Sequence, residues 1–388
     1  MITKVVIIVE APFGQRDYIR YGIEIIKKNG FDVVVWNLTP LLHHSAYVNI
    51  QLPDPIVSDD IIYFHTQCEF QSAIGNLEES AFIYTTLVLS SATHPVFKSI
   101  SQSNIPYCVT SLNAVPSFGK THSIPLWERV KNITWKKIII KLFSSVSTKL
   151  LGIRKASMVA VLGNKTDFNR PEVGEETRIV YTQSVDYDRY LEANLSSEQL
   201  PSGIVFLDNY LPYHTDSIYS GETSPVSAVT YHDSLNRLFA FLENKTGKKV
   251  IIAAHPKANY ASEGNPFNGR MIITGKTAEL VKVADLVVLN FSTSFNFAVL
   301  YNKPVVFFTS NDLEKVELYR THIKGMANLF NKQPLNIDEE FKMKEDQLYK
   351  VEYEKYKEYK NGFIKLDGTP EIPVWQIMCD AFKTFKEK

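Results

Sequence analysis

Residues 250–254 read VIIAA and lead into His255-Pro256, and residues 286–308 read LVVLNFSTSFNFAVLYNKPVVFF. In each stretch a short apolar run ends abruptly in polar residues: the histidine in the first, and Asn290 with the hydroxyl cluster Ser292-Thr293-Ser294 in the second. Short apolar runs bounded in this way are typical of strands buried on both faces of a parallel sheet. Because ligands of open α/β sheets bind beyond the carboxyl ends of the strands, we expect a binding site at these polar residues.

Both polar groups suit an anion such as a phosphate. Pro256 cannot donate a ladder hydrogen bond, so the strand ends there and leaves His255 at its tip, where an imidazole can donate a hydrogen bond or a proton. The hydroxyls of residues 292–294 precede a helical stretch at 295–301, whose first N–H groups carry partial positive charge. Each feature alone has an ordinary explanation, a loop histidine or a helix N-cap, but their order within one domain favours a phosphate site.

The chain has 388 residues, which suits two domains of under about 200 residues each. Apolar runs alternate with helical patterns at 18–28, 234–243 and 277–283, as in two successive α/β domains. The candidate strands are 5–9, 32–36, 61–64, 82–88, 107–110 and 158–162 in the first series, and 203–207, 250–254, 271–274, 286–289 and 305–308 in the second. The polar segment 186–201 is the expected hinge, which divides the chain into domains 1–195 and 196–388.

Charge and cysteine usage exclude several classes of protein. The 42 basic residues balance 42 acidic ones, which argues against a generic nucleic-acid binder. Cys68, Cys108 and Cys379 are far apart and form no cluster with histidines, so neither a disulfide framework nor a zinc site is expected. This usage favours a reducing, cytoplasmic compartment. No apolar run reaches the ~18 residues that span a bilayer.

The C-terminal half resembles the donor domain of GT-B glycosyltransferases that make bacterial surface polysaccharides, and it is most similar to the CMP-sugar-using, sialyltransferase-like and capsule-type enzymes. The residues that carry the resemblance are His255-Pro256, Ser292-Thr293-Ser294 and the run AVLYNKPVVFF at 298–308. The resemblance implies a GT-B fold, in which two Rossmann-like α/β domains face each other across a cleft. Domain 1–195 would bind the acceptor and domain 196–388 the donor, and helices at 346–359 and 375–385 would pack back across the hinge.

The resemblance also implies an activity. The protein would be a glycosyltransferase (EC 2.4) that needs no metal and no cofactor. It would move a CMP-activated nonulosonic acid, such as a sialic, pseudaminic or Kdo-type sugar, onto a glycan or lipid-linked glycan of capsule or lipopolysaccharide, with inversion. His255 would contact the donor phosphate and assist its departure, with Pro256 and Lys257 beside it. Ser292, Thr293 and Ser294 would bind the phosphate or the cytidine monophosphate.

The general base is less well defined, because the related enzymes take it from an acidic pair followed by glycine. The nearest counterpart, at 207–210, reads LDNY, so Asp208 is a base candidate or, with His214, a donor-binding residue.

A second base candidate lies in the loop at 10–17, which reads EAPFGQRD. Asp17 is either the base or the cap of the helix that follows, and Glu10 is a further base candidate. Gly14, Gln15 and Arg16 would hold acceptor hydroxyls. The loop lacks GxGxxG, so the dinucleotide-binding fingerprint is absent.

Two other functions fit the same residues. One is a UDP- or dTDP-sugar-dependent GT-B transferase, or a nucleotide-sugar epimerase, for which Asp312, Glu314 and Glu317 would supply the ribose-binding acid. The other is a non-catalytic protein that binds a glycan or a nucleotide-sugar without turnover.

Residues 127–155 carry eight basic residues against one acid, with aromatic and aliphatic residues interleaved. Such a pattern is typical of a helix lying on an anionic membrane surface, and equally of a solvated helix that covers a core. The first interpretation predicts peripheral attachment at the inner face of the cell membrane.

Overall fold

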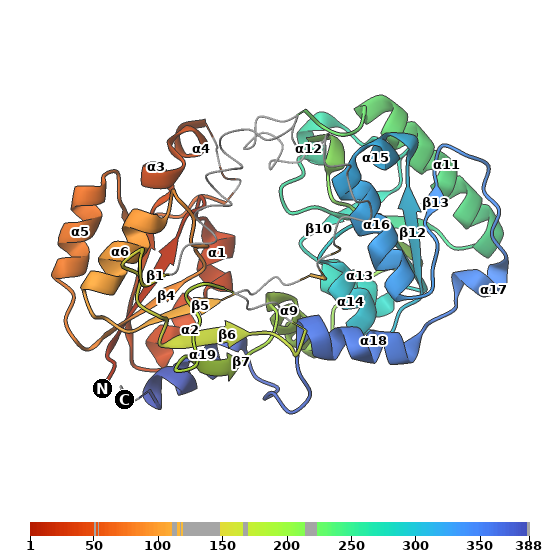
Figure 1. Ribbon diagram of the computed structural model, residues 1–388. Helices are drawn as coiled ribbons and strands as arrows, with labels where there is room; N and C mark the ends of the chain where they lie inside the picture. Colours follow the sequence, from red (N-terminus) through yellow and green to blue (C-terminus); the bar gives the residue numbers. More distant parts are fainter. Residues whose placement is uncertain are drawn as a thin grey trace, which may run out of the picture. The chain divides into compact units, whose positions relative to one another are not determined.

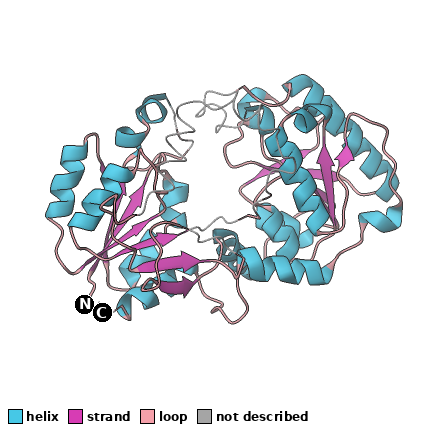
Figure 2. Cartoon of the chain, viewed as in Figure 1, coloured by secondary structure: helices cyan, strands magenta, loops and turns pink. Residues whose placement is uncertain are grey.

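The computed structural model describes residues 1–49, 52, 54–110, 115–116, 118, 148–165, 170–213 and 223–385. The chain folds into two compact units (Figure 1). The first comprises Met1–Ala114, Ser123–Val185 and Leu366–Lys388, and the second comprises Val115–His122 and Asp186–Lys365. Each unit is built on its own parallel sheet (Figure 2).

The sheet of the first unit has seven parallel strands in the order β3-β2-β1-β4-β5-β6-β7. Alternate residues of β1 enter different cores: Val5 and Ile7 belong to one cluster, and Val6 and Ile8 to the other. Both faces are therefore buried, which explains why the strands read as unbroken apolar runs. The strands are β1 (Lys4–Val9), β2 (Asp32–Asn37), β3 (Ile61–Tyr63), β4 (Ala81–Thr85), β5 (Tyr107–Thr110), β6 (Met158–Val161) and β7 (Arg178–Tyr181).

The single helix expected at 18–28 is wrong. The structure has two helices there, α1 (Gln15–Arg20) and α2 (Ile23–Lys28), separated by Gly22 at a φ of 57°. A side chain at Gly22 would lie 2.3 Å from the ring of Trp375. The absence of a side chain at this position therefore lets Trp375 of the last helix, α19, pack against the backbone between α1 and α2. The other helices of this unit are α3 (Thr39–Leu42), α4 (His44–Asn49), α5 (Gln67–Gly75), α6 (His94–Gln102) and α19 (Val374–Lys383).

The sheet of the second unit has six parallel strands in the order β10-β9-β8-β11-β12-β13. It too is buried on both faces, because Val205 and Leu207 of β8 belong to one core and Ile204 and Phe206 to the other. The strands are β8 (Ile204–Leu207), β9 (Val250–Ala254), β10 (Met271–Thr274), β11 (Leu286–Leu289), β12 (Val305–Thr309) and β13 (Leu335–Asn336).

Two predictions about segments of the second unit need correction. The hinge expected at 186–201 is largely helix α9 (Val185–Leu195), and its Tyr187 and Ala193 pack into the core of the second unit. The boundary between the units therefore precedes this helix.

The other helices of the second unit are η1 (Leu211–Tyr213), α11 (Ala228–Thr246), α12 (Tyr260–Glu263), α13 (Thr277–Val283), α14 (Phe295–Leu300), α15 (Asn311–Lys315), α16 (Glu317–Leu329), α17 (Glu345–Leu348), α18 (Tyr353–Tyr359) and η2 (Lys360–Ile364).

The helix expected at 346–359 is interrupted, and both of its parts, α17 and α18, stay with the second unit. Leu348 of α17 is buried in one core of this unit, whereas Tyr356 and Tyr359 of α18 are buried in the other. One straight helix cannot pack against both faces of the sheet, so the helix is interrupted between α17 and α18. Among the described helices that follow residue 345, α19 is the one that belongs to the first unit, where the indole N–H of Trp375 donates to the Arg20 carbonyl at 2.8 Å.

Candidate functional site

The polar residues singled out in the sequence meet at the carboxyl edge of the second sheet. β8 ends before Asp208, β9 before His255 and β11 before Asn290. The strand order reverses between β8 and β11, because β9 and β10 lie to one side of β8 while β11 and β12 lie to the other. Such a reversal separates the loops that follow the two central strands and is where open α/β sheets bind ligands.

Asp208 is buried and accepts three hydrogen bonds. Its Oδ1 accepts from the N–H of Tyr210 at 2.8 Å, and its Oδ2 accepts from the Tyr260 hydroxyl at 2.8 Å and from the N–H of His255 at 3.4 Å. Burial raises the pKa of the Asp208 carboxyl, and these donors oppose the shift. The carboxylate thus links the end of β8 to the start of the loop after β9. This geometry favours a positioning role over that of a general base.

His255 is half-buried at the tip of β9, as the sequence predicts. The N–H of Lys257 donates to His255 Nδ1 at 3.2 Å, so in the neutral ring the hydrogen resides on Nε2. Pro256 is exposed and Lys257 is half-buried. The loop therefore holds the imidazole in a tautomer that can donate a hydrogen bond from Nε2.

The hydroxyl cluster lies at the start of α14, as expected. Ser292 Oγ accepts from the N–H of Ser294 at 3.2 Å, and Thr293 is exposed. α14 has only six residues, so its dipole is small and the hydroxyls themselves are the principal donors. β8 lies between β9 and β11, so the tips of these two strands are roughly 10 Å apart. His255 and the hydroxyls thus share one edge of the sheet and are separated by a strand.

An amide pair spans the reversal between β8 and β11. The side-chain N–H₂ of Asn209 donates to Asn290 Oδ1 at 2.9 Å and to the Phe291 carbonyl at 3.3 Å. The amide of Asn290 in turn donates to the Tyr231 hydroxyl at 3.3 Å. These bonds fix the two loops that flank the proposed site. Sequence reasoning missed this pairing and that of Tyr260 with Asp208, because nothing local indicates partners 81 and 52 residues apart.

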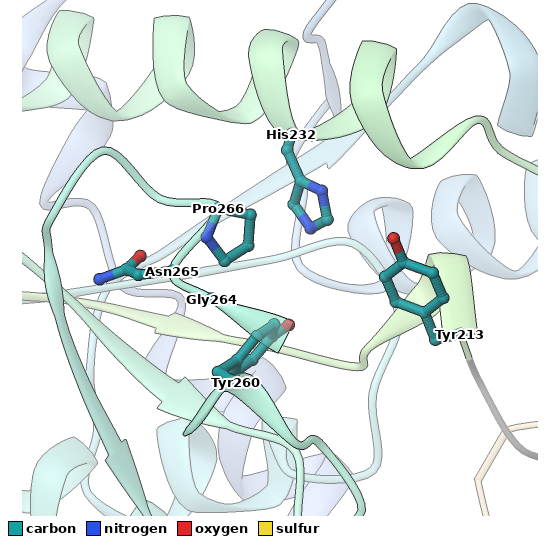
Figure 3. Close-up of a pocket in the computed structure, with 6 residues that line it drawn as sticks. All are labelled: Tyr213, His232, Tyr260, Gly264, Asn265 and Pro266. Atoms are coloured by element: carbon teal, nitrogen blue, oxygen red, sulfur yellow. The ribbon is translucent and has the colours of Figure 1, made fainter. Parts of the chain in front are cut away.

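A cavity of about 200 Å³ lies next to the His255 loop (Figure 3). Tyr260 joins the two, because its ring lines the cavity while its hydroxyl binds Asp208. The imidazole of His232 points from α11 toward Tyr213, Tyr260 and Pro266. Burial lowers the pKa of His232, and a hydrogen bond to the Ala228 backbone opposes the shift. The cavity is lined by Tyr213, His232, Tyr260, Gly264, Asn265 and Pro266.

In the first unit, the loop after β1 is held by residues near Asp54. The N–H of Gln15 donates to the Asp54 carbonyl at 2.8 Å, and that of Arg16 to its carboxylate at 2.7 Å. A side chain at Gly14 would lie 2.6 Å from Asp54, so only glycine fits there. Asp17 Oδ2 accepts from the N–H of Gly14 at 3.2 Å, so this carboxylate caps α1.

Glu10 follows β1 directly and pairs with His43, whose Nε2 lies 3.2 Å from its carboxylate. Both side chains are partly exposed, at 32% for Glu10 and 48% for His43. His43 was not foreseen from the sequence, because it lies 33 residues away in the loop between α3 and α4.

His214 and residues 127–147 lie outside the described residues, so the structure does not test the roles predicted for them. Within the described part of the chain, no helix is long and apolar enough to cross a membrane. Among the same residues, no group of three or more His, Cys, Asp or Glu side chains is arranged to hold a metal ion.

No family model matches this chain, and no curated protein matches its sequence. Among solved structures, the H444N variant of the wall teichoic acid polymerase TagF is similar over 98% of this chain and 88% of its own, with a TM-score of 0.52 and 12% identity. MurG of Acinetobacter baumannii covers 99% and 100% of the two chains (TM-score 0.48, 12% identity). The UDP-GlcNAc 2-epimerase of Methanocaldococcus jannaschii covers 95% and 94% (TM-score 0.45, 12% identity). The two parallel sheets and the similarity to TagF show that this chain has the GT-B glycosyltransferase fold, with two Rossmann-type domains.

Proposed function

We propose that this protein is a glycosyltransferase that takes its sugar from a nucleotide-activated donor bound at the carboxyl edge of the second sheet. The observation that carries the proposal is the convergence of His255, the Asn209–Asn290 pair and the hydroxyls of residues 292–294 around the reversal of strand order. None of these side chains is acidic, and the imidazole and the hydroxyls can donate hydrogen bonds, which suits a phosphate-bearing ligand.

Two contacts would hold the donor. His255 donates from Nε2 to a phosphate oxygen, with the Lys257 ammonium adding positive charge nearby. The hydroxyls of Ser292, Thr293 and Ser294 bind a second part of the nucleotide, because the roughly 10 Å between the strand tips exceeds a single phosphate. Asp208 acts on the donor only indirectly, by fixing the loop that carries His255.

In the transfer step the acceptor oxygen bonds to the anomeric carbon while the bond from that carbon to the phosphate oxygen breaks. The phosphate leaves with the bonding electrons, and His255 stabilises the charge that develops. The acceptor proton passes to a carboxylate of the loop after β1, Glu10 or Asp17, with Gly14, Gln15 and Arg16 holding the acceptor. General-base catalysis of this kind contributes about 10²–10⁴-fold.

We propose CMP as the nucleotide and a nonulosonic acid as the sugar, transferred with inversion onto a surface glycan or its lipid-linked precursor. The proposal draws on the likeness of the His-Pro and Ser-Thr-Ser motifs to CMP-sugar enzymes. It places the protein in the cytoplasm, in contact with the inner membrane face through residues 127–155 where the acceptor is lipid-linked.

The test is a calorimetric titration of the whole protein with CMP, UMP, UDP, GDP and dTDP, followed by product analysis with matching sugar donors. CMP binding and transfer from a CMP-sugar support the proposal. Preference for UDP or dTDP would overturn the CMP assignment, and formation of an epimerised nucleotide-sugar would replace the transferase by an epimerase. If no nucleotide binds, the donor site is wrong.

A further inference from the structure

The cavity lined by Tyr213, His232 and Tyr260 has no role in the transfer step as proposed. Two hydrogen bonds connect its wall to the proposed donor site. Tyr260, which lines the cavity, donates to Asp208, and Asp208 accepts from the N–H of His255. A nucleotide whose phosphate lies at His255 can therefore place its base, which is one ribose away from the phosphate, in this cavity. With a volume of about 200 Å³, the cavity accommodates one ring system and not a whole nucleotide.

The lining of the cavity suits a flat, uncharged ring. Two tyrosine rings, the His232 imidazole and Pro266 surround it, and none of its six lining residues is acidic, Lys or Arg (Figure 3). The Asn265 amide is engaged in its own turn, donating to the Arg270 carbonyl at 2.9 Å and accepting from the N–H of Phe267 at 2.9 Å. Aromatic faces stack well on heteroaromatic rings.

His232 supplies the polar group that would recognise such a ring. Only 8% of this residue is exposed, and burial lowers the pKa of its imidazole, which favours the neutral ring. The neighbouring Ala228 backbone opposes this shift only in part. The ring points into the cavity, where an unprotonated ring nitrogen would accept a hydrogen bond.

We propose that this cavity holds the base of the donor nucleotide and that His232 selects cytosine by accepting a hydrogen bond from its exocyclic amine. The inference rests on the proposed donor site and names the base that the site reads. Uracil presents a carbonyl oxygen where cytosine presents the amine, so two acceptors would face each other there. A site built around one hydrogen bond discriminates strongly against a ligand that lacks it.

The first experiment leaves the protein unchanged and varies the base. Calorimetry on the wild-type chain compares CMP with UMP and with pyrimidin-2-one riboside 5′-monophosphate, which lacks the amine but keeps the ring and the phosphate. We expect CMP to bind at least about tenfold more tightly than either. Equal affinities for the three nucleotides would overturn the inference. The same equality is expected if the cavity holds a sugar ring and not the base. If none binds, it is the donor site itself that fails.

The second experiment removes the acceptor. We expect His232→Leu to weaken CMP binding to the level of UMP, and His232→Gln, which keeps an amide oxygen as acceptor, to retain part of the preference. Tyr213→Ala serves as the matched control: it removes a ring from the cavity wall and should weaken CMP and UMP equally. Thermal unfolding reports whether each variant is folded. If His232→Leu folds and still prefers CMP by tenfold, another residue reads the base and the role of His232 is refuted.

Discussion

Replacing Tyr260 by phenylalanine tests the hydrogen-bond network that holds the His255 loop. The substitution keeps the buried ring and removes only the hydroxyl, which donates to Asp208 Oδ2 at 2.8 Å. No cavity forms, because phenylalanine fills the same space. The measured effect is therefore that of one hydrogen bond to a buried carboxylate.

The expected loss follows from the type of bond. A hydrogen bond to a charged group contributes about 1.5–3 kcal/mol to the free energy of unfolding. For a unit of 150–250 residues this corresponds to a fall in Tm of about 3–12 °C. The hydroxyl lowers the pKa of Asp208 against the dominant effect of burial, so its loss raises that pKa further. The penalty should thus be smaller at a pH where the folded protein holds Asp208 protonated, and grow as the pH rises through the folded pKa of Asp208.

Urea unfolding followed by circular dichroism between pH 4 and 8 measures this penalty. Tyr213→Phe is the matched control, because Tyr213 lines the same cavity with its side chain 47% exposed and should change stability by under about 0.5 kcal/mol. A Tyr260→Phe variant as stable as the control at pH 7, or a penalty independent of pH, would refute the reasoning.

Three further predictions follow from the same contacts. Because burial raises the pKa of Asp208, the contribution of this residue to stability should fall as the pH rises from about 4 toward 7. Asp208→Asn should therefore stabilise the protein more at pH 7 than at pH 4, relative to the wild type, in urea titrations; a difference independent of pH would contradict the assignment. His255→Ala should lower transfer from a CMP-sugar by about 10²-fold without unfolding the protein, whereas the exposed His44→Ala should be neutral in the same assay; equal rates would remove His255 from the mechanism. Gly22→Ala should destabilise the first unit by over about 2 kcal/mol, because it adds a clash with Trp375 to the cost of a positive φ. Gly30→Ala is the control: Gly30 has a φ of 87° and open space around it, so this substitution measures the backbone cost alone, about 1–2 kcal/mol. Equal losses of stability in the two variants would mean that α19 does not pack against Gly22.

The sequence predicts most of the fold because apolar runs and turn residues are local signals. Strands β5, β9, β10 and β11 lie at the predicted residues, and α13 matches its predicted helix. β7 was missed because this edge strand is largely exposed and flanked by charged residues, and β13 because it has only two residues. The break at Gly22 was missed because it depends on Trp375, 353 positions later.

The site was predictable in part for the same reason. Where strands end can be read from the sequence, and the parallel topology brings those ends to one edge, so the positions of His255 and the hydroxyl cluster at that edge were predictable. Burial and distant partners leave no local signal. The three donors to Asp208 and the pairing of Glu10 with His43 were therefore not foreseen, whereas the cap formed by Asp17 was one of the two roles that the sequence left open for it.

The most direct test of the donor site is backbone hydrogen exchange of the whole protein with and without saturating CMP. The account predicts slower exchange in peptides covering 208–213, 255–260 and 290–296, since the bound nucleotide would order the loops at the carboxyl edge of the second sheet. Unchanged exchange in all three segments while CMP is bound, with protection elsewhere, would contradict it.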